Sequence, residues 1–405
     1  MKLITTTALA LVAALAAAPA SAQTPSAPAQ QTVKITPSKG ALKAISELND
    51  AVNKSDFASV PAKVTAAQAV ATTKEDRYLI GQLQLKAALA EKSDAATAAA
   101  IDSLAASGYL EASKTSQLYQ GLGGSYFNNK QYPQAAAAYQ KALALDPNNT
   151  EAGSLLGESL FAQGQKAQAA AAFQRAVQAR VAAGQKPDET LIKRAVAVAY
   201  DAQSPVAVDL ARQWVAAYPS ASSWSDAIAI YTNLNHPDVE GTLDLLRLMQ
   251  VAGAMNRGGE YAQYARAAAE QNNFNEAQTA FDAGVAAKMI DPSKPEYSDL
   301  VSGLKSKPKA TAADLEAATK TAQSGMALLR IGDRYYSMGD YAKAVELYKM
   351  SMGKPGVDAA VANLHIGMAL VRAGDKAGAT TALNAVTGPR ADIAKFWLTY
   401  LNQKG

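Results

Sequence analysis

The 405-residue sequence contains no cysteine and only two histidines. The absence of cysteine excludes disulfides, thiol chemistry and a lipid anchor on a cysteine. With His236 and His365 alone, no cysteine or histidine pair has the spacing of metal ligands, so we expect no metal and no other cofactor. His236 precedes a proline in an expected turn, and His365 lies between Leu364 and Ile366 on an expected helix. Both positions favour a structural histidine over a catalytic one.

An excess of one charge is also absent. The 39 basic and 35 acidic residues leave a formal net charge of +4. Removal of Lys2 with a cleaved leader would lower that value from +4 to +3. Because this charge is small for the length of the chain, we expect no nucleic acid among its partners.

Motifs of known enzymes are weak in this sequence. The glycine-rich stretch 121–124 lies on a helical stripe and lacks both the GK[ST] ending and the preceding strand of a phosphate loop. Ser302 and Ser306 each begin a Ser-x-x-Lys pattern, but no KTG sequence follows. The acidic residues are spread along the expected helices, and no isolated carboxylate pair stands out. We therefore predict that the chain is not an enzyme.

Long hydrophobic runs are missing after the N-terminus. Residues 1–22 combine Lys2, an apolar run and a small-residue ending, which is the pattern of a secretory signal peptide with cleavage after Ala22. No later stretch has the ~20 apolar residues of a membrane span, so we expect no stable membrane insertion. The predicted location is the periplasm, with secretion as the alternative. Residues 23–39 are rich in Pro, Ser, Gln and Ala and predict a flexible leader.

The clearest pattern is a helix-turn-helix unit at residues 116–147. Gly123 and Ala135 are small where the two helices must approach closely, and Pro147 ends the second helix. The large or inward-facing side chains recur at helical spacing. They are Tyr119, Leu122 and Tyr126 on the first helix, and Ala135, Tyr139 and Ala142 on the second.

The same pattern recurs further along the chain. A shift of 34 residues maps Leu122, Gly123 and Tyr139 onto equivalent residues of a second copy, and a third copy lies near the C-terminus. The equivalents are Leu156, Gly157, Ala169, Phe173 and Ala176, and later Ile331, Gly332, Tyr335, Tyr341, Ala344, Tyr348 and Ser351. This order of aromatic, Gly, Ala and Pro residues resembles the tetratricopeptide repeat, a unit of about 34 residues, in a protein of the secreted or periplasmic bacterial type.

The resemblance implies an all-α fold, a right-handed superhelical solenoid of helix-turn-helix repeats. We expect a first array over residues 40–301, a linker or bend at 302–310, and further repeats over 311–405. The last expected helix carries Ile393, Phe396 and Trp397 on one face, as a cap of the final repeat requires.

Members of the family that the chain resembles bind peptides or proteins in a groove lined by the first helix of each repeat. The resemblance therefore implies a non-enzymatic scaffold or adaptor for another protein or peptide, with envelope assembly as its setting. A protein that binds cell-wall glycan or peptide, or an accessory factor of an enzyme, is the alternative. The expected groove residues are Gln117, Gln120, Asn128, Glu151, Ser154, Glu158, Arg330, Asp333, Tyr336 and Arg372.

Overall fold

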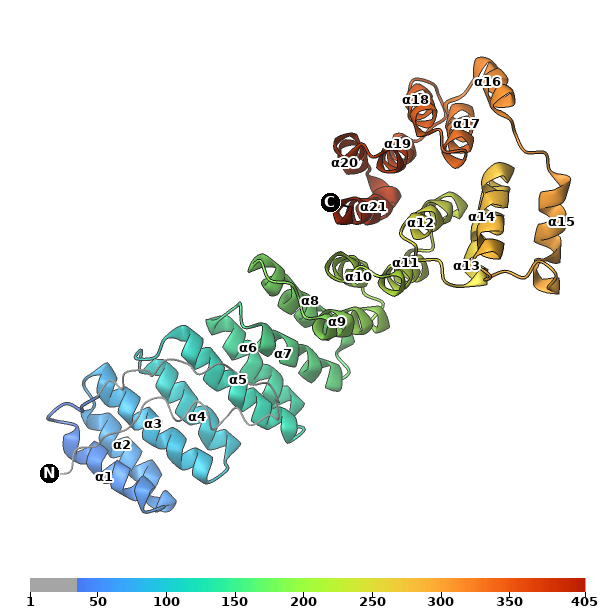
Figure 1. The fold of residues 1–405 in the computed structure, drawn as a ribbon. Helices are drawn as coiled ribbons and strands as arrows, with labels where there is room; N and C mark the ends of the chain where they lie inside the picture. The colour runs from blue at the N-terminus through green and yellow to red at the C-terminus, as the bar shows by residue number, and fades with distance from the viewer. Residues whose placement is uncertain (1–34, 405) are drawn as a thin grey trace. The chain divides into compact units, whose positions relative to one another are not determined.

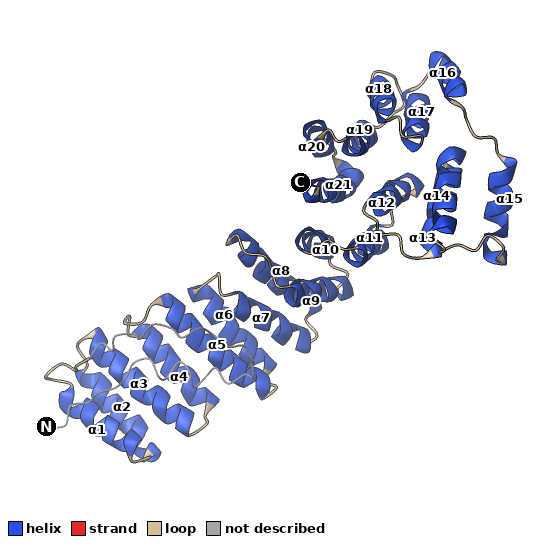
Figure 2. Cartoon of the chain, viewed as in Figure 1, coloured by secondary structure: helices blue, strands red, loops and turns tan. Residues whose placement is uncertain are grey.

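The computed structural model describes residues 35–404. The predicted signal peptide and residues 23–34 of the predicted leader lie outside this range. In the described part of the chain, 21 α-helices and three short 3-10 helices are present, with no strand (Figure 1 and Figure 2). The predicted all-α helical-repeat fold is therefore confirmed. None of the helices within residues 35–404 is both long and apolar enough to cross a membrane.

Two compact units make up the chain. The N-terminal unit ends at Val206 and the C-terminal unit begins at Ala207. The segment 302–310, predicted as a linker between two arrays, lies inside the C-terminal unit, and its first residues belong to a helix that ends at Ser306. The division of the structure therefore differs from the expected one. The physical reason is that helices on both sides of this segment pack together within one unit.

Antiparallel helix pairs stack in sequence order in the N-terminal unit, and each helix contacts the next. The helices are α1 Leu42–Asn53, α2 Val60–Val70, α3 Lys74–Ala90, α4 Asp94–Ala106, α5 Ala112–Asn128, α6 Tyr132–Leu145, α7 Thr150–Ala162, α8 Lys166–Ala182 and α9 Glu189–Asp201, with a 3-10 turn at Phe57–Ser59. Asp76 is buried near the start of α3 and accepts hydrogen bonds from the backbone N–H and the hydroxyl of Ser38, at 2.7 and 2.8 Å. This contact attaches the chain before α1 to the core.

Each clear pair is closed by a glycine that faces an aromatic ring. A Cβ atom added at Gly123 would lie 2.6 Å from the ring of Tyr139, and one at Gly157 would lie 2.7 Å from the ring of Phe173. Both distances are far below van der Waals contact. Glycine at these positions therefore lets the first helix approach the ring on the second, as the sequence pattern predicted.

The C-terminal unit also consists of consecutive helices. They are α10 Val206–Ala217, α11 Ala221–Asn235, α12 Val239–Val251, α13 Gly258–Glu270, α14 Phe274–Ala286, α15 Ser298–Ser306, α16 Ala312–Thr321, α17 Gly325–Ser337, α18 Tyr341–Met352, α19 Ala359–Ala373, α20 Lys376–Asn384 and α21 Ala391–Gln403. Short 3-10 helices at Pro295–Tyr297 and Gly388–Arg390 precede α15 and α21. The glycine contact recurs here, because a Cβ at Gly332 would lie 2.6 Å from the ring of Tyr348.

The last helix of this unit returns to its first helices. Trp397 on α21 is fully buried, and its indole N–H donates to the backbone oxygen of Asp244 on α12, at 3.3 Å. The hydroxyl of Tyr400 donates to the oxygen of Val251 at 2.9 Å, and the amide of Gln403 donates to the oxygen of Val215 on α10 at 2.8 Å. The sequence predicted that α21 caps the final repeat. The structure shows that it also covers α12, so the C-terminal unit closes on itself.

Candidate functional site

A polar face runs across the first helices of the repeats in the N-terminal unit, α5, α7 and α9. Six predicted groove residues lie on α5 and α7, and none of them is buried. Gln117, Asn128 and Glu151 are exposed, and Gln120, Ser154 and Glu158 are half-buried. These residues are three and eight positions apart on α5 and three and four apart on α7, and such helical spacings account for their common face. We call this surface the first-helix face.

Hydrogen bonds connect neighbouring helices on this face. The Asn149 amide N–H donates to Gln120 Oε1 at 2.9 Å, between the start of α7 and the middle of α5. Glu158 accepts two hydrogen bonds from Arg194 on α9, both at 2.8 Å. These hydrogen bonds to Glu158 raise the pKa of the Arg194 guanidinium. The guanidinium also lies 4.5 Å from the centre of the Phe161 ring. The sequence analysis missed Arg194, although it follows Glu158 by 36 residues, close to one repeat.

The four predicted groove residues of the C-terminal unit do not line an open groove together. Asp333 and Tyr336 are only 3% and 7% exposed, because α14 and the Arg247 side chain of α12 cover this part of α17. Arg330 is half-buried, and Arg372 is exposed. The expectation of an open groove is therefore wrong for Asp333 and Tyr336, since the unit closes on itself where an open array would leave these positions to solvent.

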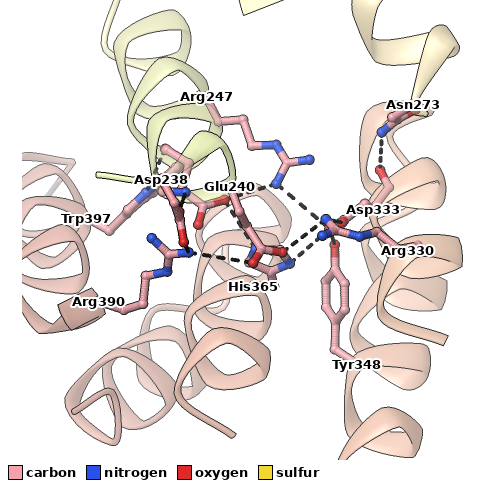
Figure 3. A network of polar contacts seen from close by, with 12 residues as sticks. Asp238, Glu240, Arg247, Asn273, Arg330, Asp333, Tyr348, His365, Arg390 and Trp397 are labelled. Carbon is pink, nitrogen blue, oxygen red and sulfur yellow. Dashed lines mark hydrogen bonds and ion pairs between the residues drawn. The ribbon is translucent and has the colours of Figure 1, made fainter. Parts of the chain in front are cut away.

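A buried ion-pair network occupies the interior of the C-terminal unit (Figure 3). Arg247, 1% exposed, donates from Nε and Nη2 to the two carboxylate oxygens of Glu276, each at 2.7 Å. Its Nη1 donates to Oδ1 of Asp244 at 3.1 Å and lies 3.8 Å from Oδ1 of Asp333. Tyr264 and Asn273 supply further donors to Glu276, at 2.9 and 2.7 Å. These bonds satisfy a charge pair that would otherwise be costly to bury.

His365 on α19 lies between two carboxylates of this network. Its Nε2 is 3.2 Å from Oδ1 of Asp244, and its Nδ1 is 2.9 Å from Oδ1 of Asp333. Burial lowers the pKa of His365, but the charges of Asp333 and Asp244 outweigh burial and raise this pKa to about 10. Burial raises the pKa of Asp333, but His365 and Arg247 hold it well below its ordinary value. The imidazole is therefore positively charged at neutral pH.

Two further arginines extend the network towards the surface (Figure 3). Arg330 lies 3.0 Å from Glu240, and Arg390 donates to both carboxylate oxygens of Asp238, at 2.7 and 2.9 Å. In the described part of the chain, no group of acidic and histidine side chains is arranged to hold a metal ion.

The charged groups at the centre of the buried network are paired with one another. Asp244, Arg247 and His365 are each no more than 1% exposed, so a substrate cannot reach them. The arrangement supports a structural role for the network. Sequence analysis missed it, although Asp244 and Arg247 interrupt an otherwise apolar run on α12. Two charged residues three positions apart in an apolar helix were the sequence feature that could have indicated a buried ion pair.

Comparison with known families agrees with the repeat geometry. Residues 123–164 match the family described as TPR repeat, and residues 151–179 match the family described as Tetratricopeptide repeat. Residues 123–179 of the chain are therefore tetratricopeptide repeats. These repeats indicate a scaffold for protein interactions, and such proteins are generally not catalytic. The comparison with curated proteins gives no match.

Solved structures resemble this chain only remotely. A structure described as the functional characterization of Pseudomonas aeruginosa pilF shares 14% identity, covers 65% of this chain and 99% of its own, and has a TM-score of 0.25. The structure of Naa15/Naa10 bound to HypK-THB shares 12% sequence identity. The match covers 90% of this chain and 65% of that chain, with a TM-score of 0.35. A tetratricopeptide repeat protein from Parabacteroides merdae shares 10% sequence identity. The match covers 82% of this chain and 100% of that chain, with a TM-score of 0.26.

Proposed function

We propose that this chain is a non-enzymatic periplasmic scaffold, which binds a protein or peptide partner of the cell envelope on the first-helix face of the N-terminal unit. The observation that carries the proposal is the different use of polar side chains in the two units. In the C-terminal unit, the polar side chains between α12, α14, α17 and α19 pair with one another and are buried. On the first-helix face, Gln117, Asn128 and Glu151 are exposed.

The chemistry of the first-helix face fits a peptide more closely than a glycan. Glycan sites commonly present aromatic rings on which sugars stack, but Tyr200 is the one exposed aromatic side chain in the described part of the chain. The face instead offers amides, the hydroxyl of Ser154 and the Glu158–Arg194 ion pair. These groups can bind both the backbone and the polar side chains of an extended segment.

Site-specific photo-crosslinking in intact cells tests the proposal. A photoreactive residue replaces Gln117 on α5, and the matched control replaces Gln140, an exposed glutamine on the second helix α6. We expect a discrete crosslinked species from position 117 and none from position 140. A second pair, Glu151 on α7 and the exposed Arg175 on α8, repeats the comparison in the next repeat. Equal crosslinking from both helices would contradict a binding site on the first-helix face.

A further inference from the structure

A cavity of about 290 Å³ lies within the C-terminal unit, beside the buried network but separate from the first-helix face. Residues of α12, α13, α14, α17, α18 and α19 line it, and three of them are tyrosines. Its volume is at the lower end of the range for small-molecule sites. Most of the wall consists of neutral side chains, and only Glu276 and Arg372 among the lining residues carry a charge.

Both carboxylate oxygens of Glu276 already accept hydrogen bonds from the protein. Oε1 accepts hydrogen bonds from Arg247 and Tyr264, and Oε2 accepts from Arg247 and Asn273. A carboxylate paired in this way, to an arginine that is itself 1% exposed, has no remaining acceptor position for a cationic ligand. The electrostatic character of the cavity is therefore set by Arg372.

Arg372 has no carboxylate partner in residues 35–404. Its Nε and Nη2 donate only to the hydroxyl of Tyr341, at 3.0 and 2.7 Å. The guanidinium lies over the Tyr341 ring, 5.3 Å from its centre, and is held at the edge of the cavity. A planar guanidinium with free N–H groups in a fixed position is well suited to a carboxylate.

Tyr336 provides a second, independent indication of a ligand. Tyr336 is only 7% exposed and lines the cavity, and none of the hydrogen bonds found within residues 35–404 involves its hydroxyl. The hydroxyl oxygen is not among the fully buried polar atoms that lack a partner, so it is open to the cavity. The Tyr336 ring packs edge-on against Tyr341, 5.5 Å between ring centres, which places it beside the residue that holds Arg372. A ligand acceptor in the cavity would satisfy the Tyr336 hydroxyl.

We propose that this cavity binds a small organic carboxylate of amino-acid or dipeptide size. The carboxylate pairs with Arg372 and accepts a hydrogen bond from the Tyr336 hydroxyl, while the remainder of the ligand packs against Tyr264 and Tyr341. One unpaired cation matches a singly charged ligand. A phosphate dianion would have an excess negative charge close to Glu276.

Binding of N-acetyl-phenylalanine to the purified full chain tests this proposal. The neutral control ligand is N-acetyl-phenylalaninamide, which keeps the ring and lacks the charge. We expect the acid to bind at least about tenfold more tightly than the amide, as a hydrogen bond to a charged group requires. Arg372→Gln and Tyr336→Phe should each weaken binding of the acid by about tenfold or more, measured by calorimetry or ligand-observed NMR.

The matched control variant is Arg334→Gln. Arg334 lies on α17, the helix of Tyr336, and like Arg372 it has no carboxylate partner in the described chain, but it does not line this cavity. The Arg334→Gln variant should bind the acid with the same affinity as the wild type. The Tyr336→Phe variant loses no intramolecular hydrogen bond, so its melting temperature should be unchanged. Equal affinities for acid and amide, unchanged affinity in Arg372→Gln, or tighter binding of inorganic phosphate would each overturn the proposal.

Discussion

Nδ1 of His365 on α19 lies 2.9 Å from Oδ1 of Asp333 on α17. The opposite ring nitrogen lies 3.2 Å from Asp244. A neutral imidazole has one N–H donor, whereas an imidazolium has two, one for each carboxylate. The ion pairs of a protonated His365 therefore connect α12, α17 and α19.

We expect the C-terminal unit to lose stability as the pH rises from about 6.5 to about 10, because protonated His365 stabilises the folded state. The pKa of His365 is about 10 when folded and returns to its ordinary value of 6.5 when unfolded. Its contribution is thus fully present below pH 6.5 and is lost as the pH rises through the folded pKa. Urea unfolding followed by tryptophan fluorescence measures this unit alone, because Trp214, Trp224 and Trp397 all lie in it.

The His365→Gln variant is the control for this pH dependence. The difference in unfolding free energy between the wild type and this variant should shrink with rising pH by on the order of 1 to 3 kcal/mol. A difference that stays constant from pH 6.5 to 10 would show that His365 does not carry the dependence.

Arg247→Met should destabilise the C-terminal unit by about 3 to 5 kcal/mol, because it leaves the Glu276 carboxylate buried without its charged partner and removes one of the two cations beside Asp244. The matched control is Arg257→Met. Arg257 also pairs with a glutamate, but its side chain is 67% exposed, so its loss should cost less than about 1 kcal/mol. The measurement is the same fluorescence unfolding, and equal effects of the two substitutions would argue against a central role for the buried pair.

Gly123→Leu should destabilise the α5–α6 pair by at least about 1 to 3 kcal/mol, because the new side chain overlaps the Tyr139 ring. Hydrogen exchange of residues 112–145 reports this pair directly. The comparison variant is Glu158→Ala, which removes a half-exposed ion pair and should change stability by less than about 1 kcal/mol. If exchange in Gly123→Leu matched that of Glu158→Ala, the close helix contact would not be the reason for glycine.

Trp397→Ala should loosen both ends of the C-terminal unit. The substitution creates a cavity costing about 3 to 5 kcal/mol and removes the bond to Asp244. Hydrogen exchange should increase in α12 as well as in α19 and α20, since α21 contacts all three. Lys395→Ala, an exposed position on the same helix, should leave exchange unchanged. An increase confined to α19 and α20 would indicate a cap on the last repeat without closure of the unit.

Export should yield a mature protein that begins at Gln23 and is released by osmotic shock. The basis is the pattern of residues 1–22, with a small-residue ending at Ala22. N-terminal sequencing of the released protein provides the measurement. An uncleaved chain that remains with the membrane fraction would show that these residues act as an anchor.

The amino-acid sequence by itself determined the repeat unit. Helical stripes such as Tyr119, Leu122 and Tyr126 depend only on spacing along one helix, and a glycine such as Gly123 marks a contact within one pair. Such contacts join residues about half a repeat apart, as between Gly123 and Tyr139, so they recur in the sequence with the period of the repeat. The all-α repeat fold was therefore predictable from short-range patterns.

The tertiary structure alone decided where the array closes and which polar residues are buried. The hydrogen bond between Trp397 and Asp244 joins residues 153 positions apart, and no local periodicity predicts such a pair. Because α21 packs on α12, polar positions on α17 that correspond to solvent-facing positions on α5 and α7 are buried. The buried carboxylate of Asp333 is then stabilised by the positive charges of His365 and Arg247. Burial of charge depends on which surfaces meet in three dimensions, because the cost of desolvation is set by everything that surrounds the group.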